Sequence, residues 1–144
     1  MTANLEIPGY TLEKCLGAGG MAQVYLALQH SLNRRVALKL ITLGDAELRE
    51  RFIHEGRMVA RLNHHHIITI HDVREFPGGC YMAMEYAEGG ALDQRIRQGL
   101  TAEQALTFLR QIAAALDHAH QQGLVHRDIK PGNILFMANG DAKV

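Results

Sequence analysis

The order of the expected elements is the feature that most constrains the fold of this chain. Alternating or β-branched apolar residues predict strands over residues 10–16, 23–28, 35–42, 67–73 and 80–86. Apolar positions at helical spacing predict helices over residues 45–62, 92–98 and 102–122. The first ninety residues are therefore expected to form a small sheet with one helix, and the rest of the chain is expected to be helical. Short turns between the first three strands predict an antiparallel meander, with Gly17, Gly19 and Gly20 in the first turn.

The longest expected helix, residues 102–122, is also the most apolar. Thr101 and Gln104 have the spacing of a capping box, and Gly123 is a plausible stop. The apolar stripe is wide, so this helix needs covering on more than one side. After it, residues 134–136 and 142–144 predict a short hairpin around a polar turn.

Composition excludes several classes of protein. Lys plus Arg and Asp plus Glu both number 15 in the 144 residues, so no basic excess predicts binding to nucleic acid or to an acidic membrane surface. No apolar run approaches the roughly 18 residues of a membrane span, and the start of the chain lacks signal-peptide features, which makes the cytoplasm the default compartment. Cys15 and Cys80 both lie in apolar, strand-like surroundings, where a small buried hydrophobic role is expected rather than a disulfide.

Glycines are concentrated in LGAGGMAQVYLA, residues 16–27, between the first two expected strands. Glycines let a turn approach phosphate groups closely and leave backbone N–H groups uncovered. A tight hairpin turn is the simpler alternative. Because a strand and not a helix follows, a dinucleotide-binding fingerprint is disfavoured.

Lys39 interrupts VALKLI, the most apolar strand, on the same face as Ala37 and Ile41. A lysine placed in this way either extends its amino group to solvent from an edge or meets an anion. Glu55, in the helix that follows, is a candidate partner.

The segment HRDIKPGN, residues 126–133, concentrates charged and amide groups between apolar flanks. Asp128 and Asn133 carry oxygen atoms suited to a hydroxyl proton and a hard cation, and Lys130 can neutralise a transferring phosphate. The alternative is a solvated turn that merely contains charges, and the apolar residues on both sides argue against it.

Taken together, these segments resemble the N-terminal portion of a protein kinase domain, most closely that of the bacterial eukaryotic-type (Hanks-type) serine/threonine kinases. The phrases that carry the resemblance are IPGY, LGAGGMAQVYLA, RRVALKLI, RFIHEGRMVARLNH, AMEYAEGGAL and LVHRDIKPGNIL. The resemblance implies an α+β, protein kinase-like fold, with a complete N-lobe at residues 1–86 and a truncated helical C-lobe at residues 87–144. It implies transfer of phosphate from ATP with Mg²⁺ to serine or threonine hydroxyls of proteins. The 144 residues end before the AspPheGly motif, so little or no transfer is expected from them alone.

The resemblance also assigns roles to single residues. It implies that Lys39 holds the ATP phosphates while paired to Glu55, that Asp128 accepts the substrate's hydroxyl proton, that Lys130 steadies the γ-phosphate, and that Asn133 binds magnesium. It makes Met84 the gatekeeper before a hinge at residues 85–87. The residues expected to contact the nucleotide are Leu16, Gly17, Ala18, Gly19, Gly20, Met21, Ala22, Val24, Ala37, Lys39, Met84, Glu85, Ala87 and Leu135.

The sequence departs from the family pattern at two places within the chain, the first of them a mild change, and two other functions remain as alternatives. Ala22 replaces the third glycine of many kinases, and HHHI at residues 64–67 replaces the usual HisProAsnIle. The three histidines suggest a metal site, and with the cysteines they make a metal-binding or redox protein one alternative. A second alternative is a non-catalytic, kinase-like nucleotide-binding or interaction module, for which the apolar helix would supply a surface for a partner.

Overall fold

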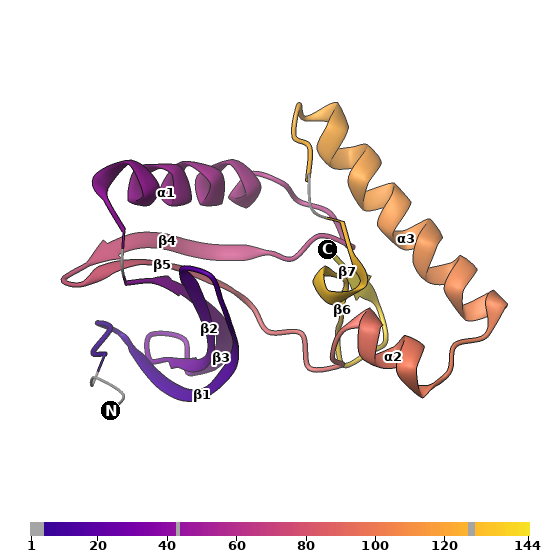
Figure 1. Cartoon of the computed structure of the whole chain (residues 1–144), viewed down its shortest axis with the longest axis horizontal. Helices are drawn as coiled ribbons and strands as arrows, with labels where there is room; N and C mark the ends of the chain where they lie inside the picture. Colours follow the sequence, from indigo (N-terminus) through magenta and orange to yellow (C-terminus); the bar gives the residue numbers. More distant parts are fainter. Residues whose placement is uncertain (1–4, 43, 127–128) are drawn as a thin grey trace. The chain divides into compact units, whose positions relative to one another are not determined.

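The computed structural model describes residues 5–42, 44–126 and 129–144 (Figure 1). The chain divides into two units. The first contains the described parts of Met1–Arg61 and Thr69–Tyr86, and the second contains those of Leu62–Ile68 and Ala87–Val144.

The first unit is built on a five-stranded antiparallel sheet in the order β1-β2-β3-β5-β4. Its strands are β1 (Tyr10–Gly19), β2 (Ala22–Gln29), β3 (Arg34–Ile41), β4 (Ile70–Phe76) and β5 (Gly79–Glu85). Each of the five strands was predicted from its apolar pattern. The α+β class and the antiparallel meander of the first three strands are therefore confirmed.

The first turn differs from the prediction. Gly17 and Gly19 lie within β1, where they pair with Val24 and Ala22, and the turn itself is at Gly20 and Met21. Gly20 has φ of 56°, a left-handed conformation that glycine adopts without steric cost. Glycine content indicates a turn nearby, but the pairing with β2 decides where the strand ends.

Alternate residues of β3 pack on opposite faces of the sheet. Val36, Leu38 and Leu40 point to one face, where they form a core with buried residues of β1, β2 and β5. This core includes Tyr10, Ala27, Tyr81 and Ala83, and the rings of Tyr10 and Tyr81 meet edge to face with centroids 5.3 Å apart.

Helix α1 (Ala46–Ala60) packs along β4 and β5 on the other face, as Figure 1 shows. Asp45 caps its start, because its carboxylate accepts a hydrogen bond of 2.9 Å from the backbone N–H of Leu48. Phe52 is buried against Ile41 and Cys80. The burial of Cys80 agrees with the sequence prediction.

Gly56 lets α1 approach the sheet. A Cβ at this position would lie 2.7 Å from the methyl carbon of Met82 and 2.9 Å from Cγ2 of Val73. Both distances are shorter than van der Waals contact, so the close packing of helix and sheet here depends on the absence of a side chain.

The second unit contains α2 (Leu92–Gln98), α3 (Ala102–Gln121), a 3₁₀ turn (Pro131–Asn133), and a hairpin of β6 (Leu135–Phe136) and β7 (Ala142–Lys143). The predicted capping box of α3 is confirmed: Thr101 Oγ1 accepts from the N–H of Gln104 at 3.1 Å, and Gln104 Oε1 accepts from the N–H of Thr101 at 3.0 Å. The predicted hairpin is also present, and its Phe136 is fully buried.

One expectation about burial is wrong, and the apolar surface expected on the helix at residues 102–122 is exposed in part. Cys15 is exposed, although its strand-like surroundings predicted a buried side chain. On α3, Ile112 and Ala115 are buried, whereas Leu106 and Leu109 of the apolar stripe are 49% and 61% exposed. No helix in the described ranges has the length and apolar character needed to cross a membrane.

Candidate functional site

The strand register gathers several of the predicted site residues on one face of the first unit's sheet. Gly17 of β1 lies opposite Val24 of β2, Val24 lies opposite Lys39 of β3, and Lys39 lies opposite Met82 of β5. Directly opposed residues point to the same face of a sheet. A row of four residues therefore crosses four strands, with a single positive charge, that of Lys39, in an otherwise uncharged row.

A second row lies next to the first on the same face. Leu26 of β2 is opposite Ala37, and Ala37 is opposite Met84 of β5. Ala37 is buried and Met84 is half-buried. The two rows make an apolar surface beside the amino group of Lys39. Such a surface can bind a ligand in which a flat, apolar ring is joined to a negatively charged group.

Lys39 is half-buried, and its side chain forms no hydrogen bond or ion pair within the described part of the chain. Glu55, its predicted partner on α1, is exposed and is not paired with it. The next residue, Gly56, packs against Met82, so α1 lies beside the row that contains Lys39. The amino group of Lys39 thus keeps its three donors available for an anion.

The glycine-rich hairpin is exposed at its tip. Residues 16–21 are exposed, Ala18 pairs with Gln23, and Leu16 lies at an irregularity in the β1 register between Cys15 and Gly17. Nothing lies within 4 Å of the position that a Cβ would take at Gly17, Gly19 or Gly20. The backbone is therefore accessible on this hairpin, as a phosphate-covering loop requires.

Hydrogen bonds fix the end of β5. The backbone N–H of Glu85 donates to the carbonyl of Thr69 at 2.9 Å, and Glu85 Oε1 accepts from the N–H of Thr69 at 2.7 Å. In the second unit, the backbone N–H of Ala87 has no hydrogen-bond partner among the described residues. An unpaired backbone N–H at this position is available to donate a hydrogen bond to a ligand.

Lys130 and Asn133 lie at the two ends of the 3₁₀ turn in the second unit. The N–H of Asn133 donates to the carbonyl of Lys130 at 2.9 Å. Buried Ile134 follows the turn, and Leu135 pairs with Ala91. The sequence predicted buried apolar residues on both sides of residues 126–133. Among the described residues, Val125 before them is 64% exposed, and Ile134 after them is buried.

Asp128, the predicted catalytic base, lies outside the described residues, as does Arg127. The described neighbours that precede and follow them are His126 and Ile129, both exposed. The role of Asp128 therefore remains a prediction from the sequence.

The three consecutive histidines hold their segment to the β6–β7 hairpin within the second unit. His65 Nε2–H donates to Asp141 Oδ2 at 2.6 Å, which lowers the pKa of Asp141, and His66 Nδ1–H donates to the carbonyl of Ala142 at 2.8 Å. The ring of His64 lies next to that of His118, with centroids 5.2 Å apart. Partial burial lowers the pKa of His64, and the charges of the neighbouring histidines lower it further.

These contacts give the histidines a structural role. Among the described residues, no three His, Cys, Asp or Glu side chains are placed to hold a metal ion. Sequence reasoning missed Asp141 as the partner of His65, because a separation of 76 residues leaves no local signal.

Comparison with known proteins identifies the family. The family model of the protein kinase domain matches residues 10–144. This chain belongs to the protein kinase family. The sheet with α1 is accordingly the kinase N-lobe, and α2, α3 and the hairpin belong to the helical lobe.

Bacterial serine/threonine kinases are similar over nearly all of the chain. PknJ of Mycobacterium tuberculosis is 39% identical over 150 residues, covering 100% of this chain and 26% of PknJ. PksC of Streptomyces coelicolor is 42% identical over 148 residues, covering 94% of this chain and 27% of PksC. PrkC of Bacillus subtilis is 41% identical over 140 residues, covering 94% of this chain and 22% of PrkC. The chain therefore spans about a quarter of the length of these relatives.

Proposed function

We propose that this chain is the ATP-binding and catalytic-loop portion of a serine/threonine protein kinase, which transfers the γ-phosphate of ATP to hydroxyl groups of protein serine or threonine. The observation that carries the proposal is the sheet face on which Gly17, Val24, Ala37, Lys39 and Met84 lie together. Family membership supports the reaction class. The cytoplasm is the proposed compartment.

On this face, adenine would pack against Val24 and Ala37, near Met84, and its edge would be read by backbone groups of the hinge at residues 85–87. The exposed hairpin from Leu16 to Ala22 would cover the phosphates with its backbone. Lys39 would attract the α- and β-phosphates with its unpaired amino group. We keep Glu55 as the residue that orients Lys39 when nucleotide is bound, since α1 is already packed beside the row that contains Lys39.

The catalytic loop would supply the remaining groups. Asp128 would accept the proton of the attacking hydroxyl, and Lys130 would stabilise the negative charge of the transferring phosphate. The amide oxygen of Asn133 is a hard donor and fits magnesium, which favours oxygen ligands. When bound, magnesium neutralises charge on the ATP phosphates.

Equilibrium binding of a fluorescent ATP analogue with Mg²⁺ tests the nucleotide site. Lys39→Met should weaken binding about tenfold or more, because a hydrogen-bonded charge contributes about 1.5–3 kcal/mol. Arg51→Met removes the same charge from an exposed position of α1 and should leave the affinity unchanged. Equal affinities of the Lys39→Met variant and the unmodified chain would contradict the proposed site.

A nucleotide-binding or interaction module without transferase activity is the second candidate. The exposed Leu106 and Leu109 on α3 favour it, because such a surface suits a protein partner. Incorporation of γ-labelled phosphate into protein serine or threonine, lost in Asp128→Asn, would decide for the kinase. Because little or no transfer is expected from these 144 residues alone, ATP binding without incorporation fits both candidates, and the module is supported only if a protein partner binds the chain and replacing Leu106 and Leu109 by polar residues abolishes that binding.

A further inference from the structure

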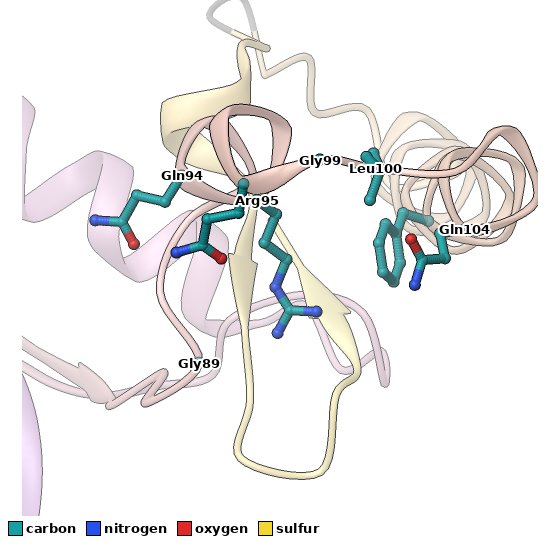
Figure 2. A pocket seen from close by; sticks show the side chains of 8 residues that line it. Gly89, Gln94, Arg95, Gly99, Leu100 and Gln104 are labelled. Atoms are coloured by element: carbon teal, nitrogen blue, oxygen red, sulfur yellow. The ribbon is translucent and has the colours of Figure 1, made fainter.

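The second unit has a hollow between α2 and the start of α3, apart from all the residues assigned above (Figure 2). Its volume is about 310 Å³, enough for one or two side chains and at the lower limit for a small-molecule site. The residues that line it are Gly89, Gln94, Arg95, Gln98, Gly99, Leu100, Gln104 and Phe108.

Arg95 supplies the positive charge of this hollow. Its guanidinium carbon lies 3.7 Å from the centroid of the buried Phe136 ring and 5.8 Å from that of Phe108. Figure 2 shows the side chain extending from α2 across the β6–β7 hairpin. Stacking on an aromatic ring fixes the plane of a guanidinium group and leaves the N–H groups at its edge free to bind.

Those N–H groups have no partner within the described part of the chain. Arg95 forms no ion pair and no side-chain hydrogen bond there. Asp93, the acidic residue of α2, is 3.9 Å from Arg97 instead. None of the described lining residues is acidic, so the charge of Arg95 is not neutralised from within the hollow.

Two glutamines add further donors. Gln94 Oε1 accepts from the backbone N–H of Ala91 at 3.4 Å, and Gln104 Oε1 accepts from that of Thr101 at 3.0 Å. Each oxygen is therefore occupied by a helix cap, and the NH₂ group of each amide remains. The lining thus presents a guanidinium edge and amide donors to whatever enters, with apolar surface from Leu100 and Phe108 beside them.

We propose that this hollow binds a carboxylate side chain of an acidic protein segment, as a docking site separate from the residues of phosphoryl transfer. A guanidinium edge matches the two oxygens of a carboxylate in a bidentate pair. Leu100 and Phe108 would contact the methylene groups of that side chain or an apolar neighbour, which free phosphate does not possess. The ligand is thus a protein segment that carries a glutamate or aspartate beside an apolar residue.

Fluorescence anisotropy of a labelled peptide of alternating leucine and glutamate, titrated with the full chain, tests the proposal without ATP. The isosteric peptide with glutamine in place of glutamate should bind more weakly, with a loss of affinity of about tenfold or more. Arg95→Gln should cause a similar loss, while Arg110→Gln, which removes the same charge from an exposed position of α3, should not. Equal binding of both peptides, or an unchanged affinity of Arg95→Gln, would overturn the proposal.

A second pair of variants does not disturb the stacked arginine. Gln98 lines the hollow, is exposed and has no hydrogen bond among the described side chains. Gln98→Glu should weaken binding of the acidic peptide and Gln98→Lys should strengthen it, and indistinguishable affinities would count against the site. Displacement of the peptide by inorganic phosphate at constant ionic strength would overturn the choice of a carboxylate. Because ATP is absent, failure here leaves the proposed kinase function untouched.

Discussion

Replacing Gly79 by alanine tests how closely β5 approaches β3. A Cβ at Gly79 would lie 1.9 Å from the carbonyl oxygen of Ile41 and 3.0 Å from Cα of Thr42, which are backbone atoms and cannot rotate away. The φ angle of Gly79 is not in the left-handed region, so steric overlap alone requires glycine here. Gly17 provides a matched control, because its φ is also ordinary and nothing lies within 4 Å of its Cβ position.

The size of the overlap sets the expected cost. Ordinary contact begins near 3.4 Å, so the Ile41 carbonyl or the β4–β5 turn would have to move by about 1.5 Å. Overpacking of a buried site costs about 1–3 kcal/mol, and a clash with backbone belongs at the upper end, so we expect about 3 kcal/mol for Gly79→Ala. Gly17→Ala should instead stabilise by about 0.5 kcal/mol, because alanine restricts the unfolded chain.

Urea unfolding followed by tyrosine fluorescence measures both effects. All four tyrosines lie at positions 10, 25, 81 and 86, in the first unit, and the chain has no tryptophan. With a urea dependence of about 2 kcal/mol per M, Gly79→Ala should lower the midpoint by about 1.5 M. A midpoint unchanged in Gly79→Ala, or lowered as much in Gly17→Ala, would refute the packing argument.

Three further predictions follow from single contacts. Partial burial lowers the pKa of His64 and of His71 from 6.5, so on acidification the unfolded chain takes up protons that the folded chain does not. The urea midpoint should therefore fall between about pH 7.5 and 5.5. If replacing both histidines by glutamine left this dependence of the urea midpoint on pH unchanged, the explanation would be contradicted. Thr101→Ala removes the cap of α3 and should cost about 1 kcal/mol of unfolding free energy, whereas serine at this position should retain most of it. Cys15 is exposed and should react with a maleimide in the native protein. Burial covers the Cys80 thiol and raises its pKa, so Cys80 should be labelled only after unfolding, and mass spectrometry of the labelled protein measures both.

Local patterns predicted most of the fold because each depends on neighbouring residues. Alternation in VALKLI indicated that Lys39 shares a face with Ala37, and the register of β3 with β2 and β5 agrees. The short helix α2 begins at Leu92 and ends at Gln98 as predicted, and the capping box of α3 formed from the spacing of two residues.

Contacts between distant parts of the chain were beyond these patterns. Cys15 has the same strand-like surroundings as a buried residue, but alternation alone does not say which face is covered. The segment near residue 67 was predicted as strand, yet β4 begins at Ile70, because the N–H of Ile68 donates instead to the carbonyl of Val144. The hollow around Arg95 depends on stacking against Phe136, which lies 41 positions later in the sequence and could not be anticipated from spacing.

Labelling of lysines by an acyl-phosphate derivative of ATP tests the central claim most directly, because such a reagent acylates amines that lie beside bound phosphates. The chain has four lysines, at positions 14, 39, 130 and 143, so mass spectrometry can assign every product. The proposed site predicts rapid acylation of Lys39, with Lys130 as the second target, and protection of both by excess ATP with Mg²⁺. Labelling spread equally over all four lysines, or unaffected by ATP, would contradict the assignment of this sheet face as the nucleotide site.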